Sequence, residues 1–254
     1  MICGLSGKAR RLEMVKKGKR YTEARKAVDA KMNYALDDAM KLIDGTKTAK
    51  FDETVEVAVK LGIDPRQANQ QIRAGMVLPH GIGKDIRVIV FAKDDKQREA
   101  KEAGADHVGL DDLIEKISGE NWLDFDVSIA TPDVMNIVAK LGKVLGPRGL
   151  MPSPKVGTVT FDVAHAVKEA KAGRIEVKND KGGVVHAPIG KASFGPDKLK
   201  DNFLVFMDSL LKMKPPSSKG VFVRKITLSN TMGPGIKVDF INVREALKSA
   251  QAAV

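Results

Sequence analysis

Hydrophobic and polar residues alternate most regularly between Phe51 and Lys60, where Val55, Val57 and Val59 occupy every second position. A period of two over this length predicts a β-strand with one buried and one solvated face. Residues 22–44 carry apolar side chains at helical spacing instead, which predicts a single helix before that strand.

The middle of the chain alternates between short apolar runs and amphipathic segments. The expected strands are 86–92, 106–110 and 126–130, and the expected helices are 96–104, 113–117, 132–145 and 162–172. Thr131 followed by Pro132 is typical of a helix N-terminus, with the threonine as its cap. Strands that alternate with helices are typical of a parallel α/β layer.

The last third of the chain returns to strand-like alternation. Strands at 174–178 and 183–187 flank Asn179-Asp-Lys-Gly, whose composition predicts a hairpin turn. The remaining expected elements are a helix at 196–213 and strands at 74–78, 220–228 and 236–240.

These shifts predict an α+β domain built from both chain ends, residues 1–81 and 174–254. An α/β three-layer (Rossmann-like) domain, residues 82–173, is inserted between them. Residues 1–20 are expected to form a disordered tail. The two linkers would cross side by side near 79–81 and 173, and such a double connection permits hinge motion.

The positive charge supports a division between the ends and the middle. The chain has 43 Lys and Arg against 32 Asp and Glu, a net charge of +11. Residues 82–173 contain 13 basic and 15 acidic residues, a net of −2, so the two ends together carry +13. This excess indicates a polyanionic partner, nucleic acid before an anionic membrane surface. The alternative is that lysines only keep the ends soluble.

Few residues suit catalysis or metal binding. Cys3 is the only cysteine, and the four histidines are scattered, so we expect no metal site and no cofactor. The dinucleotide and Walker fingerprints are absent. The loop Gly146–Lys155 could cradle phosphate around Arg148, although its prolines donate no N–H; otherwise it is an ordered surface loop. The rival hypothesis is an enzyme whose α/β middle binds a nucleotide.

The chain is also expected to be cytoplasmic, because no apolar run is long enough for a membrane span and the start lacks the order of a signal peptide. Its 12 aromatic residues are too few for stacking platforms along single strands. A folded RNA is therefore the expected ligand, which makes the α+β domain of the two chain ends an RNA-binding domain. The expected contacts are the solvated face of the strand at 51–60 and the turn at 231–235. Gly233 permits close backbone approach there, unless Met232 is a core residue and Gly233 a plain turn.

Several long strings give a resemblance to a known family. They are Lys-Phe-Asp-Glu-Thr-Val-Glu-Val at 50–57, Leu-Gly-Ile-Asp-Pro-Arg at 61–66, Leu-Pro-His-Gly at 78–81, Ala-Thr-Pro-Asp-Val-Met at 130–135, Leu-Gly-Pro-Arg-Gly-Leu-Met-Pro-Ser-Pro-Lys at 145–155, Ala-Gly-Arg-Ile-Glu at 172–176 and Thr-Met-Gly-Pro at 231–234. From about Lys16 to Val238 the chain resembles the family of large ribosomal subunit protein one, of bacterial type. Ser153 stands where that family more often has Asn.

The resemblance implies a structural ribosomal protein that is not an enzyme. It would bind large-subunit ribosomal RNA at a mobile stalk, near the exit site for deacylated tRNA, and assist tRNA release. It would also repress translation by binding the leader of its own mRNA, and would be a monomer when free of the ribosome.

The resemblance further implies which residues face RNA. By motif they are Lys50, Phe51, Thr54, Glu56, Thr231, Met232 and Gly233, with Lys60, Asp180 and Lys181 as weaker candidates. Phe51 and Met232 would pack against sugar or base. The two threonines would hydrogen-bond RNA. Glu56 would accept from a 2′-hydroxyl or a base amine, orient a nearby cation, or form only an internal salt bridge.

Overall fold

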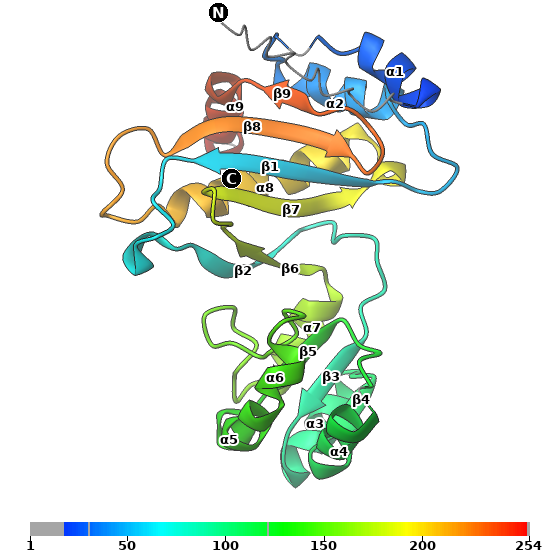
Figure 1. The fold of residues 1–254 in the computed structure, drawn as a ribbon, viewed down its shortest axis with the longest axis vertical. Helices are drawn as coiled ribbons and strands as arrows, with labels where there is room; N and C mark the ends of the chain where they lie inside the picture. The colour runs from blue at the N-terminus through cyan, green and yellow to red at the C-terminus, as the bar shows by residue number, and fades with distance from the viewer. Residues whose placement is uncertain (1–17, 30, 121, 253–254) are drawn as a thin grey trace, which may run out of the picture.

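The computed structural model describes residues 18–29, 31–120 and 122–252, and its largest sheet joins strands from both ends of the chain. Strand β1 (Thr54–Leu61) pairs antiparallel with β7 (Val184–Lys191) on one side and with β8 (Val223–Asn230) on the other. Strand β9 (Ile236–Val238) pairs antiparallel with β8 at the edge of the sheet, which gives the order β7-β1-β8-β9 seen in Figure 1. The predicted strand is confirmed from Thr54 onward, whereas residues 51–53 precede it.

Helices cover one face of this sheet and leave the other face to solvent. They are α2 (Leu36–Gly45), α8 (Pro196–Lys212) and α9 (Phe240–Ala252). Helices α8 and α9 lie behind the sheet in Figure 1. The inward side chains of β1 are buried against them, whereas its other side chains are exposed or half-buried, as the period of two requires.

A second, two-stranded sheet lies below the first. Strand β2 (Arg73–Val77) pairs antiparallel with β6 (Arg174–Lys178). The predicted turn at 179–182 is confirmed, because Asp180 N–H donates to the Val184 carbonyl at 2.8 Å and Asn179 forms an isolated antiparallel bridge with Val185. Beyond that bridge β6 and β7 do not pair but join different sheets. The chain diverges at buried Asn179, whose Oδ1 accepts the N–H of Ile72 at 2.7 Å and draws β6 toward β2.

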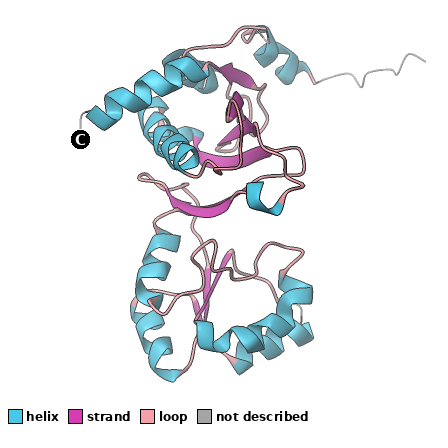
Figure 2. Cartoon of the chain, turned by 90° about the vertical axis from the view of Figure 1, so that its left-hand side faces the viewer, coloured by secondary structure: helices cyan, strands magenta, loops and turns pink. Residues whose placement is uncertain are grey.

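The middle of the chain forms a parallel sheet in the order β4-β3-β5. Its strands are β3 (Val88–Phe91), β4 (His107–Gly109) and β5 (Val127–Ala130), and its longer helices are α3 (Asp94–Glu102), α4 (Asp111–Glu120) and α7 (Val163–Lys171). One apolar cluster packs α4 and residues 134–145 against the sheet, and another packs α3 and α7. Figure 2 shows these helices on both sides of the strands. The whole is a mixed α/β fold with several sheets, as expected.

The single helix predicted for residues 22–44 is wrong. The structure has α1 (Lys19–Lys26) and α2, separated by a stretch that joins the large sheet. Between them Tyr34 N–H donates to the Lys237 carbonyl, and the Tyr34 carbonyl accepts from Asp239 N–H. These long-range bonds interrupt a local periodicity. Residues 1–17 of the expected tail lie outside the described residues, but Lys19 and Arg20 are helical, which corrects the boundary at 20.

The predicted helix at 132–145 is a chain of single turns instead. The turns are η2 (Pro132–Val134), α5 (Met135–Val138), η3 (Ala139–Leu141) and α6 (Gly142–Leu145). Apolar residues at three- and four-residue spacing are still buried, which is why the periodicity looked helical. Thr131 makes no side-chain capping hydrogen bond.

The C-terminal helix α9 was not predicted. The expected strand 236–240 ends at Val238, and Phe240 is already the first residue of α9. Val243 and Leu247 are buried one helical turn apart, and this spacing is the local indication of a helix in the sequence.

The two segments that connect the large sheet with the parallel sheet touch at a pair of glycines. Gly81 and Gly173 both have positive φ, 65° and 101°. A Cβ added to Gly173 would lie 2.4 Å from the Gly81 Cα, so only glycine lets the two backbones approach this closely. Buried Asn202 of α8 anchors the crossing, because its Nδ2 donates to the Gly81 carbonyl at 3.0 Å.

Candidate nucleic-acid interface

The uncovered face of the large sheet carries mainly polar and cationic side chains. On β1 the residues of this face are Glu56, Ala58 and Lys60, which lie opposite Ser229, Thr227 and Lys225 of β8. On the other side, His186 of β7 lies opposite Ala58, and Pro188 lies opposite Glu56. Lys237 of β9 continues the row beyond Thr227. This composition suits an anionic ligand that is read by its backbone.

Two segments far apart in sequence meet at the start of β1. The Thr231 hydroxyl accepts a hydrogen bond from Thr54 N–H at 3.0 Å and lies 3.2 Å from the Thr54 carbonyl, to which it donates. Phe51 and Met232 flank this contact, and each keeps 57 % of its surface exposed. Their exposed apolar surface is available to a ligand at the place where the two segments meet.

We call this region the Phe51–Met232 edge. It comprises the residues that the resemblance implied as RNA-facing, namely Lys50, Phe51, Thr54, Glu56, Thr231, Met232 and Gly233. The Thr231 hydroxyl bonds the Thr54 backbone, and the Thr54 hydroxyl accepts from Lys191 Nζ, so both hydroxyls have a structural role. The alternative that Met232 is a core residue is wrong, because its side chain is exposed.

Gly233 has little room for a side chain. Its N–H donates to the Asn230 carbonyl at 3.1 Å, and an added Cβ would lie 3.1 Å from the Asn230 Cβ. Asn230 is itself buried, and its Nδ2 donates to the Ile43 carbonyl at the end of α2. The turn is thus held close to the body of the protein, and a side chain at position 233 would press on Asn230, although the φ of Gly233 is not positive.

The weaker candidates do not join this edge. Lys60, Asp180 and Lys181 lie at the far end of β1, six residues or about 20 Å from Thr54 at roughly 3.3 Å per residue. Lys60 Nζ donates to the Gly182 carbonyl at 3.1 Å. Asp180 Oδ1 accepts the N–H groups of Gly182 and Val184, and the hydrogen bond from Val184 is the main cause that lowers the pKa of Asp180. Asp180 therefore shapes its own turn.

Sequence reasoning missed two residues at the Phe51–Met232 edge. Lys191 Nζ donates to the Thr54 hydroxyl at 3.0 Å, so a cation of β7 stands beside the threonine pair. Glu53 is buried, at 2 % exposure, and bonds both segments of the edge. Glu53 lies two residues before buried Val55, but a charged residue at that position gives no local sign of its partners.

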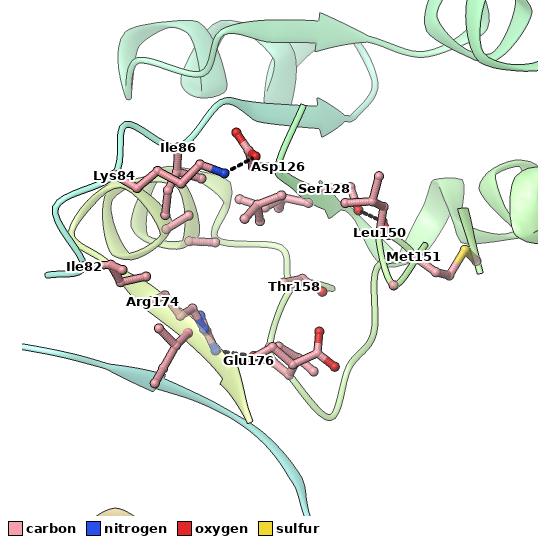
Figure 3. Close-up of a pocket in the computed structure, with 18 of the residues that line it drawn as sticks. Ile82, Lys84, Ile86, Asp126, Ser128, Leu150, Met151, Thr158, Arg174 and Glu176 are labelled. Carbon is pink, nitrogen blue, oxygen red and sulfur yellow. Dashed lines mark hydrogen bonds and ion pairs between the residues drawn. The ribbon is translucent and has the colours of Figure 1, made fainter. Parts of the chain in front are cut away.

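A cavity of about 320 Å³ lies elsewhere, between the parallel sheet and the β2-β6 pair (Figure 3). Lys84 bonds Asp126, Glu176 bonds Arg73, and the Arg174 Nη atoms bond Glu169 and the Val156 carbonyl, whereas buried Arg174 Nε has no hydrogen-bond partner among the described residues. It includes none of the predicted RNA-facing residues. Among the described residues no His, Cys, Asp and Glu cluster suits a metal ion, and no described helix is long and apolar enough to cross a membrane.

Comparison with known families supplies an independent finding. A family model described as the ribosomal protein L1p/L10e family matches residues 42–234, more than half of the chain. The matched range includes every residue of the Phe51–Met232 edge, the weaker candidates at 60, 180 and 181, and the whole parallel sheet.

Proposed function

Because this chain belongs to the ribosomal protein L1p/L10e family, we propose that it binds RNA through the Phe51–Met232 edge. Membership makes it a ribosomal protein of the large subunit that binds ribosomal RNA, located on the ribosome in the cytoplasm. The family is structural, so the rival hypothesis of a nucleotide-binding enzyme is wrong.

The proposal rests on one observation, namely that residues 51–54 and 231–233 are hydrogen-bonded to each other at an exposed surface. Phe51 and Met232 offer apolar area for a sugar or a base, while Lys50 and Lys191 offer charge for phosphates. Glu56 is exposed on the same face, where it accepts from a 2′-hydroxyl or a base amine. Lys60 and Lys181 extend the cationic surface along the sheet.

We infer that the chain is organised as two domains, one from 1–81 and 174–254 and an inserted one from 82–173. Support comes from the buried clusters, because the residues of the largest cluster come only from the two end segments and from none between 83 and 173. The middle segment has its own clusters on both faces of its sheet. The glycine crossing at 81 and 173 would then be the hinge.

The finer role follows from the motif resemblance. We propose that this protein, of the bacterial type, sits on the stalk of the large subunit near the tRNA exit site and assists release of deacylated tRNA. The same edge would bind the leader of its own mRNA and repress translation. One surface serves both RNAs if the two sites share a fold, since phosphate and shape contacts do not depend on the rest of the transcript. Off the ribosome the protein would be a monomer.

Capture of cellular RNA tests the proposal. The tagged full chain is incubated with total RNA from its source cell, and the bound fragments are sequenced. Large-subunit ribosomal RNA should dominate, with the protein's own transcript second. Phe51→Ala should lose both, whereas Phe161→Ala should not, because Phe161 is an equally exposed phenylalanine, at 59 %, on the middle segment. Equal loss in the two variants, or capture of unrelated RNA, would contradict the assignment.

A further inference from the structure

Glu53 is a buried acidic residue, and all the bonds of its carboxylate go to backbone N–H groups. Its Oε1 accepts from Thr48 N–H at 3.0 Å and from Ala49 N–H at 2.8 Å. Its Oε2 accepts from Met232 N–H at 3.1 Å. A single carboxylate thus joins the 48–49 backbone to the backbone of Met232, which lies 179 residues after Glu53 in the sequence.

The two segments that this carboxylate joins are those that present the exposed apolar pair. Residues 48–49 immediately precede Lys50 and Phe51, and Met232 is itself bonded through its N–H. The Glu53 carbonyl also accepts from Ala192 N–H at 2.8 Å, next to Lys191. Glu53 therefore stands directly beneath the proposed contact surface while touching none of its solvent side.

We propose that Glu53 is the positioning residue of the RNA interface, which holds Phe51 and Met232 at a fixed separation before RNA arrives. This inference rests on the proposed function of the Phe51–Met232 edge. Preorganisation of this kind raises affinity because the free protein has less freedom to lose when the RNA binds.

The residue type is specific for this task. An ionised carboxylate only accepts hydrogen bonds, and here three backbone donors converge on it. A glutamine has one oxygen and one NH₂ group, so in either orientation its NH₂ faces at least one backbone N–H. Glu53→Gln thus keeps the shape and the burial but releases one of the two segments.

The sign of the effect separates positioning from plain electrostatics. A negative charge beneath a surface that binds phosphates repels them, so its removal alone would tighten RNA binding. Positioning predicts the reverse, namely weaker binding after the charge is removed. Asp52 provides the matched control, since it carries the same charge at the neighbouring position and bonds Ser193 instead of the Met232 turn.

The experiment measures the affinity of the wild type, Glu53→Gln and Asp52→Asn for purified large-subunit ribosomal RNA by filter binding at several salt concentrations. Urea denaturation confirms that each variant is folded at the assay temperature. Hydrogen exchange reports on the Met232 amide. We expect Glu53→Gln to bind about tenfold more weakly or worse, with an unchanged salt slope and faster exchange at Met232. Asp52→Asn should bind as the wild type does or slightly more tightly.

Each outcome decides something. If the wild type does not bind this RNA, the proposed function fails. If it binds but folded Glu53→Gln binds equally well or better, the function stands and the positioning role of Glu53 is wrong. If Glu53→Gln does not fold, exchange in the wild type decides instead. The Met232 amide should be protected although its side chain is exposed, and exchange as fast as in a free peptide would refute the contact.

Discussion

Thr54 and Thr231 show what single residues contribute to the proposed interface. Their hydroxyls are engaged within the protein, with Thr231 bonded to the Thr54 backbone and Lys191 bonded to the Thr54 hydroxyl. Residues proposed to contact RNA are therefore also residues that build the surface. Variants at these positions change affinity in two ways, through lost contacts and through lost geometry, and exposed Met232 is the cleaner probe.

Met232→Asp should weaken RNA binding. The new carboxylate would stand in an exposed apolar position beside phosphates, with a cost of roughly 2 kcal/mol or more. A gel-shift titration measures the change, and Met232→Leu serves as the apolar control that should bind normally. Equal affinity of the aspartate variant would remove Met232 from the interface.

At the scale of elements, the contact between β1 and the 231–233 turn is long-range and depends on few bonds. Thr231→Val removes the hydroxyl but keeps the shape, so Thr54 N–H loses its acceptor. The free energy of unfolding should fall by about 1 kcal/mol. Urea denaturation monitors this loss. Thr231→Ser, which keeps the hydroxyl, should lose less, and a valine variant as stable as the serine variant would argue against the bond.

The hydrogen bond of Asp106 at the junction of β3 and β4 makes the stability of the protein depend on pH in a defined direction. Asp106 Oδ2 accepts from Val88 N–H at 2.9 Å, and this bond is the main cause that lowers the pKa of Asp106. Because the folded pKa lies below the unfolded value of about 3.9, the contribution to stability is present above that value and is lost as pH falls through the folded pKa.

The corresponding variant is Asp106→Asn. It should be less stable than the wild type near pH 6, and the difference should shrink on acidification below about pH 4. Urea midpoints at both pH values measure it, with the exposed loop variant Asp85→Asn as the control for loss of one charge. A difference between wild type and Asp106→Asn that is constant with pH would exclude this carboxylate as the cause.

At the scale of the whole molecule, the separate cores and the glycine crossing allow the middle segment to be removed. The Gly81 and Gly173 backbones are in contact, so Gly81 can be joined to Arg174 with little distortion. The shortened chain should keep most RNA affinity, because the positive excess of +13 lies outside residues 82–173. Filter binding compares the two chains, and a folded deletion variant without affinity would place the interface in the middle segment.

Salt dependence tests the electrostatic part of the same proposal. Log affinity should fall against log salt with a slope of several units, at about −0.9 per phosphate neutralised on duplex DNA and similarly for RNA. The deletion variant should keep nearly the same slope, since its cations are retained. A flat response would indicate a ligand held by apolar contacts alone.

The amino-acid sequence by itself determined the alternation of β1, the strand and helix order of the middle segment, the charge division and the motif strings. These are local or additive properties of neighbouring residues, so they can be read without contacts. Only the tertiary structure decided that β6 leaves β7 for β2, that Tyr34 interrupts a helix to join β9, and that Glu53 reaches Met232. Each of these depends on which distant backbone groups find one another, and side-chain periodicity carries no information about that pairing.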